Sequence, residues 1–188
     1  IELNNFAATP TSMSYVFQNC YKLKSVTIPK LSTEKATSIL NLFTNCHELR
    51  SIDLTNFRLG STSNLSKMFQ NCYSLTSIAL SNFDTSSVIY FTSMFESCSK
   101  LTSLDLNNFK TSNAIDMSNM FNNCTSLEFL KVNFDTSKVT KMPRMFGSCI
   151  NLTSLDISMF NTNAVYMFEG IFENDEKLTD LVVNLKEC

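Results

Sequence analysis

The sequence has no tryptophan, and it holds only three glycines, three prolines and one histidine among 188 residues. A disulfide-rich secreted domain would be smaller and richer in glycine and turns, so that class does not fit. The single histidine, His47, leaves a catalytic triad without a second candidate base. His47 directly follows Cys46, but consecutive side chains point in different directions. We therefore expect His47 on the surface and no Cys-His dyad.

Charge and long apolar runs are also scarce. The chain has 15 Lys and Arg against 17 Asp and Glu, which gives a net charge of −2. No basic face is indicated, so neither nucleic acid nor an anionic membrane is an expected partner. No apolar run approaches the roughly 18 residues that a membrane helix needs, and no signal-peptide pattern opens the chain. We expect no membrane insertion by this segment.

What is abundant is strictly periodic. The chain contains 16 Phe, 9 Met and 7 Cys. Six cysteines recur at steps of 26, 26, 26, 26 and 25 residues, and they are Cys20, Cys46, Cys72, Cys98, Cys124 and Cys149. A phenylalanine stands three residues before each of them, and a seventh copy has Phe172 followed by Asp175 in place of cysteine. The step of 25 reflects one residue missing between Val132 and Phe134. Such a register across the whole chain indicates internal repeats.

Each repeat combines two patterns. Residues 101–106 alternate apolar and polar side chains, with Leu104 and Leu106 inward and Asp105 outward, which predicts a short half-buried strand. Residues 114–124 place Met117, Met120, Phe121 and Cys124 at i, i+3, i+4 and i+7, which predicts a short helix. The column that contains Phe91 and Phe168 is expected in the core as well.

One strand and one helix cannot bury their own apolar faces, but stacked copies can. The predicted fold class is therefore an α/β solenoid, a leucine-rich-repeat horseshoe of about seven 26-residue strand-helix repeats. A parallel sheet would form its concave face and short helices its convex face. We count eight strands, from residues 1–4 to about 182–184, and seven helices. Residues 1–188 would form one solenoid, an excerpt of a longer array, whose last repeat, 168–188, is cap-like.

The repeat resembles that of a known family. The segments "MFQNCYSLTSIALSNFDTSSV" (68–88) and "MFNNCTSLEFLKVNFDTSKV" (120–139) are similar to the "MFxxCxxLxxLDLSNFDTSxV" repeat of BspA-type leucine-rich-repeat surface proteins. The resemblance covers nearly the whole chain. It departs at Leu31, at "RLG" (58–60) and at Asp175. The resemblance implies a cell-surface or secreted protein with adhesive or binding roles, and it implies no catalytic residues.

The cysteine column suggests metal binding or redox chemistry as an alternative to packing. Zinc motifs pair cysteines two to four residues apart, whereas here none are closer than 25. Thiols of stacked copies could approach one another, but we expect their spacing to be at or beyond the limit for a disulfide. We predict buried free thiols, no metal and no cofactor. Cys188 lies outside the column and is the candidate for an exposed or intermolecular thiol.

The outward positions of the strands form the surface where binding is expected. Most are small and polar, but Phe129 stands where other repeats have serine, and Lys131 lies two residues further on. The candidate binding residues are Asp53, Asp105, Phe129, Lys131 and Asp156. Calcium bridging is weak, because Asp53 and Asp105 lie two strands apart, about 10 Å. The alternatives are a solvated face without a ligand and a Phe129 that only covers the short repeat.

The sequence thus predicts a noncatalytic binding module of a cell-surface or secreted protein, and not an enzyme. Its partner would be a protein or glycan on a host cell, a matrix component or a neighbouring surface protein. The alternative is a structural unit that self-associates into a filament or surface coat through its open ends.

Overall fold

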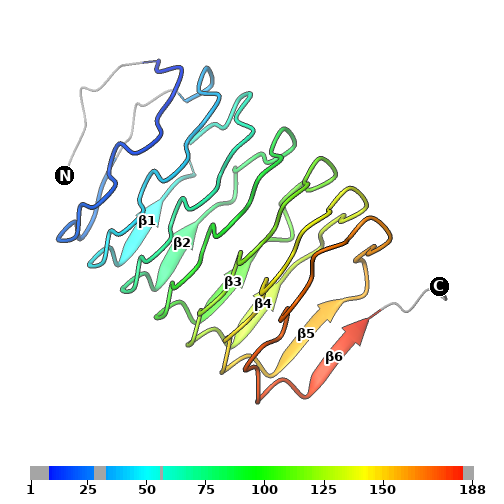
Figure 1. Cartoon of the computed structure of the whole chain (residues 1–188). Helices are drawn as coiled ribbons and strands as arrows, with labels where there is room; N and C mark the ends of the chain where they lie inside the picture. Colours follow the sequence, from blue (N-terminus) through cyan, green and yellow to red (C-terminus); the bar gives the residue numbers. More distant parts are fainter. Residues whose placement is uncertain (1–8, 28–32, 56, 184–188) are drawn as a thin grey trace.

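The computed structural model describes residues 9–27, 33–55 and 57–183, which form a stack of similar rungs, one per repeat (Figure 1). Six short strands lie on one side of the stack. They are β1 (Ser51–Asp53), β2 (Ser77–Ala79), β3 (Ser103–Asp105), β4 (Phe129–Lys131), β5 (Ser154–Ile157) and β6 (Asp180–Val183). The strands β1 and β2, β3 and β4, and β5 and β6 pair in parallel.

The register of the strands follows the repeat. Leu104 of β3 lies opposite Leu130 of β4, and both are buried between exposed neighbours. The predicted parallel strands and their alternation are therefore confirmed for this part of the chain. The predicted strand at residues 1–4 lies outside the described residues.

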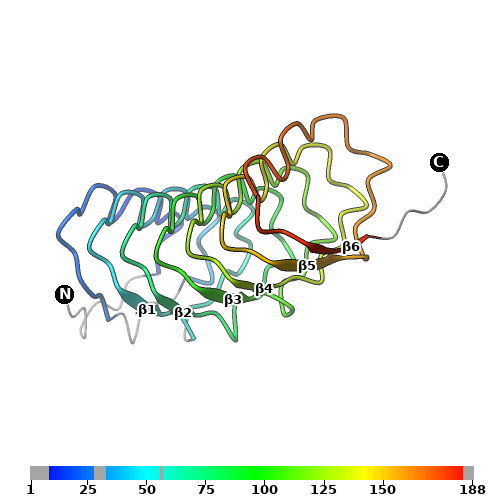
Figure 2. The ribbon, with the colours of Figure 1, turned by 90° about the horizontal axis from the view of Figure 1, so that it is seen from below.

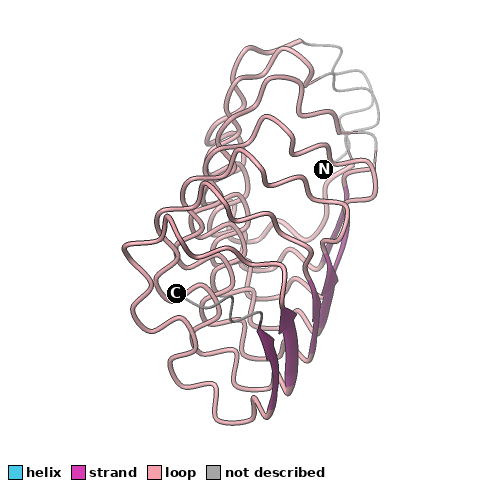
Figure 3. Ribbon diagram, turned by 90° about the vertical axis from the view of Figure 1, so that its right-hand side faces the viewer, coloured by secondary structure: helices cyan, strands magenta, loops and turns pink. Residues whose placement is uncertain are grey.

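The predicted helices are wrong: the structure contains no helix in residues 9–27, 33–55 and 57–183, and Figure 3 shows loops and turns where helices were expected. In the segment 114–124, Asn119 and Asn123 have φ angles of 55° and 61°, in the left-handed region. Each such residue interrupts a right-handed helix. The N–H groups of alternate residues, 117, 119, 121 and 123, donate to carbonyls outside the segment. For example, Phe121 N donates to Met145 O of the next rung at 2.8 Å.

The apolar positions of these segments were nevertheless predicted correctly. Met117, Met120, Phe121 and Cys124 are all fully buried. Turns closed by bonds such as Cys124 N to Phe121 O (3.1 Å) keep the same side chains inward as a helix would. The spacing i, i+3, i+4 and i+7 therefore reports which side is buried without specifying an α-helix.

The loss of the helices also removes the reason for a horseshoe. Helices are wider than strands, so a helical outer layer would splay and curve the stack. Here the phenylalanine rings in front of the cysteines stack at 5.2 to 5.7 Å between centroids, which is close to the spacing of about 4.8 Å between strands. The rungs follow one another along the stack without an outer layer of helices (Figure 2).

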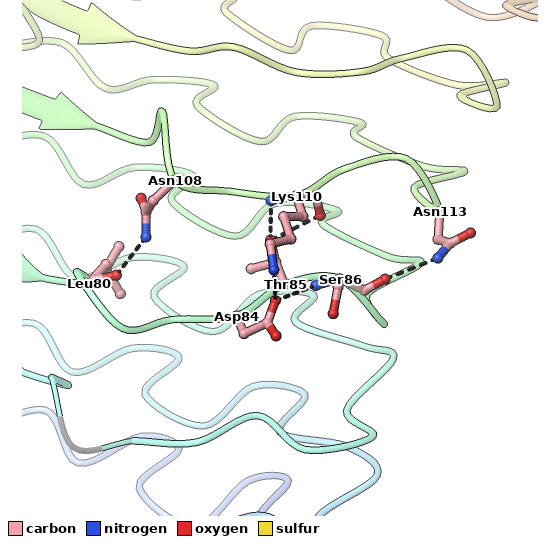
Figure 4. Close-up of polar contacts among 7 residues, drawn as sticks. All are labelled: Leu80, Asp84, Thr85, Ser86, Asn108, Lys110 and Asn113. Carbon is pink, nitrogen blue, oxygen red and sulfur yellow. Dashed lines mark hydrogen bonds and ion pairs between the residues drawn. The ribbon is translucent and has the colours of Figure 1, made fainter.

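The "DTS" segments form corners that join rungs, and they do not cap helices. Thr85 Oγ1 is buried; it donates to Lys110 O at 3.0 Å and accepts from Lys110 N at 2.8 Å (Figure 4). Asn108 and Asn113 donate from their amides to Leu80 O and Ser86 O of the preceding rung at 2.9 and 3.0 Å. Buried threonine hydroxyls and corner amides therefore satisfy the backbone where the chain turns.

The core is continuous until the last rung. Phe91 is fully buried, as predicted, but Phe168 is 60% exposed, so its predicted core position is wrong. Phe168 lies in the last rung of the described chain, where no further described rung covers its outer side. Whether the last repeat acts as a cap stays a prediction.

Candidate functional site

The most exposed aromatic side chain on the strand side belongs to Phe129, the first residue of β4. It is 66% exposed, and it pairs across the sheet with Ser103 of β3. Two residues further along β4, Lys131 Nζ lies 3.9 Å from Asp105 Oδ2, and both side chains are largely exposed. An exposed pair of this kind contributes little to stability, typically below about 1 kcal/mol.

Asp105, Phe129 and Lys131 line one depression of about 690 Å³ over β2, β3 and β4. Ser77 and Ser103 lie in the same depression, and Phe129 with Lys131 lines its C-terminal side. We call this depression the strand-side trough. The structure thus brings together Asp105, Phe129 and Lys131 of the predicted site.

The other two candidates do not line the trough. Asp53 lies in β1 opposite Ala79, and Asp156 lies in β5 opposite Val182. Their role in binding stays a prediction, and neither residue shares the trough with Phe129.

The three strand aspartates have a local structural role that sequence reasoning missed. Oδ1 of Asp53, Asp105 and Asp156 accepts the backbone N–H two residues on, at 2.9, 3.0 and 2.9 Å. Hydrogen bonds from the backbone and hydroxyl of Thr55 lower the pKa of Asp53, and those from Ser158 lower the pKa of Asp156. The signal was the repeated spacing of Asp, one residue, then Ser, Thr or Asn, which is typical of Asx turns.

A second depression lies beside the short repeat. It has a volume of about 480 Å³, and polar groups such as Asn133, Asp135 and Asn163 line it. Met159, which is 67% exposed, forms part of its border. The repeat pattern reveals the missing residue next to Asn133, but it does not indicate a recess there.

The cysteine column is a row of free thiols, as predicted. Cys46, Cys72, Cys98, Cys124 and Cys149 are buried, whereas Cys20 of the first described rung is partly exposed. Each buried thiol donates to a phenylalanine carbonyl of the preceding rung; Cys98 Sγ, for example, lies 3.3 Å from Phe69 O. Burial raises the pKa of Cys124 to about 12, so the reactive thiolate is disfavoured. Cys188 lies outside the described residues.

The residues that the structure describes include no group of three or more His, Cys, Asp or Glu that could hold a metal ion. His47 lies half-buried between two tyrosine rings, with centroid distances of 4.9 Å to Tyr21 and 4.8 Å to Tyr73. Cys46 Sγ instead donates to Phe17 O at 3.2 Å, and burial raises its pKa to about 12. The geometry offers no Cys-His pair.

Comparison with known protein families shows which family the chain belongs to. A family described as "Mycoplasma protein of unknown function, DUF285" matches residues 11–128 and 103–186. The chain belongs to the DUF285 family. No curated protein matches the sequence.

Two solved structures resemble this DUF285 chain. A leucine-rich cell surface protein from Faecalibacterium prausnitzii is 22% identical with a TM-score of 0.57, and the likeness covers 86% of this chain but 39% of that one. A leucine-rich repeat protein from Bacteroides ovatus is 21% identical with a TM-score of 0.27, covering 89% of this chain and 57% of that one. The first shows that the DUF285 chain shares a leucine-rich-repeat fold, over less than half the length of that relative.

In the described part of the DUF285 chain, no helix is both long and apolar enough to cross a membrane.

Proposed function

We propose that this DUF285 chain is a noncatalytic binding module of a cell-surface or secreted protein, and that it contacts its partner through the strand-side trough. The observation that carries the proposal is Phe129, 66% exposed on a strand that is held within the stack. An aromatic side chain on a rigid strand loses little entropy on binding and buries a large area. The resemblance to BspA-type repeats and the surface origin of the Faecalibacterium relative support the location.

The trough favours recognition by side chains over addition of a strand. The strands β3 and β4 pair with each other, and Leu106 N donates to Lys131 O at 2.8 Å, so backbone groups at the centre of the stack are already paired. A partner protein or glycan would therefore meet Phe129, the Lys131–Asp105 pair and the serine hydroxyls.

The substitution Phe129→Ser restores the residue that most repeats carry at this position. We expect it to weaken binding at least tenfold, as loss of an anchor side chain typically does, and to leave the melting temperature nearly unchanged. Binding is measured on an array of extracellular-matrix proteins and glycans. The matched control is Met159→Ser, since Met159 is 67% exposed but lies outside the trough.

A large fall in melting temperature with unchanged array binding would identify Phe129 as a packing residue. Equal losses of binding for Phe129→Ser and Met159→Ser would speak against the trough as the specific contact.

One observation favours the alternative of a self-associating unit. In the described chain β6 pairs only with β5, and Val182 and Val183 of β6 are 52% and 42% exposed. An exposed apolar edge strand is a template for another chain. Light scattering at rising concentration should then show growing particles, and Val182→Lys should suppress them by placing a charge on the edge. Constant mass at all concentrations would leave the binding module as the better account.

A further inference from the structure

Asp175 occupies the position that cysteine holds in the six preceding repeats. Both of its carboxyl oxygens are buried, and neither makes a hydrogen bond with any group in the described chain. A buried carboxylate without a partner is costly, because its charge has lost the solvation of water. Solvation at the surface therefore does not explain why an aspartate occupies this position.

The cysteine column shows what this position requires. In five successive rungs the thiol donates to the carbonyl of the phenylalanine 28 or 29 residues earlier, as Cys149 does to Phe121 O at 3.3 Å. By the same register, the acceptor for residue 175 is the carbonyl of Phe146. An ionised carboxylate only accepts hydrogen bonds, so it cannot take the place of the thiol. A neutral carboxyl group carries one O–H and can donate as the thiols do.

The surroundings of Asp175 favour the neutral form. Burial raises its pKa from 3.8 to about 6. The nearby backbone N–H of Cys149 offsets part of that rise, although its own hydrogen bond goes to Phe146 O and not to Asp175. The Cys149 thiol, which donates to Phe121 O, interacts electrostatically with Asp175, and burial keeps that thiol protonated.

Two basic side chains of the last rungs, those of Arg144 and Lys177, have other partners. Arg144 Nε donates to Glu173 Oε2 at 2.7 Å, and Lys177 Nζ donates to Asn151 Oδ1 at 2.6 Å. Within the described chain, no lysine or arginine contributes to the shift in the pKa of Asp175.

The rung that carries Asp175 is also the least covered. Phe168 and Leu181 in this rung are 60% and 38% exposed, whereas the equivalent Phe91 and Leu104 of central rungs are buried. A rung whose core positions are less covered opens more easily than a fully covered one.

We propose that Asp175 is a pH-sensitive latch for the C-terminal rung, residues 168–183. The neutral carboxyl group donates to the Phe146 carbonyl and holds the rung against the stack. The ionised carboxylate faces that carbonyl without a proton, and the rung opens to bring the charge into water. Acidity therefore holds this rung closed, and neutral pH loosens it.

The direction follows from linkage. The folded rung binds a proton on Asp175 more tightly than the open rung does, since the pKa is raised in the folded state. The stabilisation is fully present below about pH 3.8 and is lost as the pH rises through about 6. Between pH 4.5 and 7.5 we expect the opening of this rung to increase by roughly ten- to a hundredfold.

Hydrogen exchange of residues 168–183 in the full chain, corrected for intrinsic exchange rates, tests this latch between pH 4.5 and 7.5. Protection of this segment should fall with rising pH while residues 91–127 keep theirs. Asp175→Cys restores the thiol of the other rungs, and Asp175→Asn supplies a neutral amide donor. Both variants should hold the protection at a level that does not depend on pH. Asp180→Asn is the matched control, because Asp180 is an exposed aspartate of the same rung and should leave the wild-type profile unchanged.

Carbon-13 NMR of the Asp175 carboxyl group measures its titration directly, so the test does not depend on the variants alone. A midpoint near 4, or the same pH profile of protection in wild type and Asp175→Asn, overturns the proposal. A midpoint near 6 together with flat profiles in both variants supports it.

Discussion

Replacing Phe95 with alanine should lower the free energy of unfolding by about 3–5 kcal/mol, the usual range for removal of a buried phenylalanine. Phe95 is fully buried in a central rung, and its ring stacks between those of Phe69 and Phe121 at 5.7 Å from each. Rungs on both sides hold the backbone in register, so the site cannot collapse around the cavity. Urea denaturation of both proteins measures the difference.

The damage should spread in both directions from Phe95, because each rung covers two neighbours. Phe172→Ala is the matched variant: its ring stacks on Phe146 at 5.6 Å but lies in the terminal rung and is only partly buried. Hydrogen exchange should show loss of protection across the central rungs for Phe95→Ala and fraying confined to the C-terminal end for Phe172→Ala. Equal, global loss of protection in both variants would contradict a quasi-linear stack.

The inward positions could be predicted from sequence because burial repeats with the period of the chain. The columns that contain Leu104, Phe121 and Cys124 repeat every 25 or 26 residues, and such columns have to meet when the copies stack. Phe168 could not be assigned correctly by its column, since its burial depends on the rung beyond it rather than on its own repeat.

The backbone of the turn segments could not be predicted from apolar spacing alone. A helix and a series of turns with left-handed residues four apart place the same side chains inward. The discriminating signal was the residue type at those positions, such as Asn41 and Asn45, since asparagine tolerates positive φ. Asn71 Nδ2 also donates to Asn45 Oδ1 at 2.8 Å, a contact between rungs that a helix would not form.

The candidate site could be predicted in part for a similar reason. A phenylalanine at a strand position that holds serine in most repeats indicates an exposed aromatic side chain, and Phe129 is exposed. The aspartates carry a weaker signal because Asp53 and Asp156 already accept the N–H groups of their own turns. The trough depends on how β2, β3 and β4 lie side by side, which no single repeat specifies.

Gly60→Ala should destabilise the protein by about 2–4 kcal/mol, more than the same substitution at either of the other two glycines. Gly60 has a φ of 53°, and it belongs to the "RLG" corner that replaces "DTS". A Cβ there would overlap the backbone of Glu34 in the preceding rung, lying 2.6 Å from its carbonyl carbon. Positive φ alone does not decide the effect, because Asn45 and Lys67 adopt it with side chains. The decisive factor is the backbone of Glu34, which cannot rotate aside as a side chain would.

Gly147→Ala is the matched control for this corner. Its added Cβ would lie 3.1 Å from Asn122 Oδ1, which can rotate aside, and 3.3 and 3.4 Å from Arg144 Cβ and Gly170 O, which need to yield by a few tenths of an ångström at most. We therefore expect a change within about 1 kcal/mol for Gly147→Ala, because the conformational freedom removed from the unfolded chain offsets the mild crowding. Thermal denaturation of the two variants separates the causes. Equal melting temperatures would show that the 58–60 corner can move away from Glu34, and the close contact between rungs would then not be the reason for a glycine at position 60.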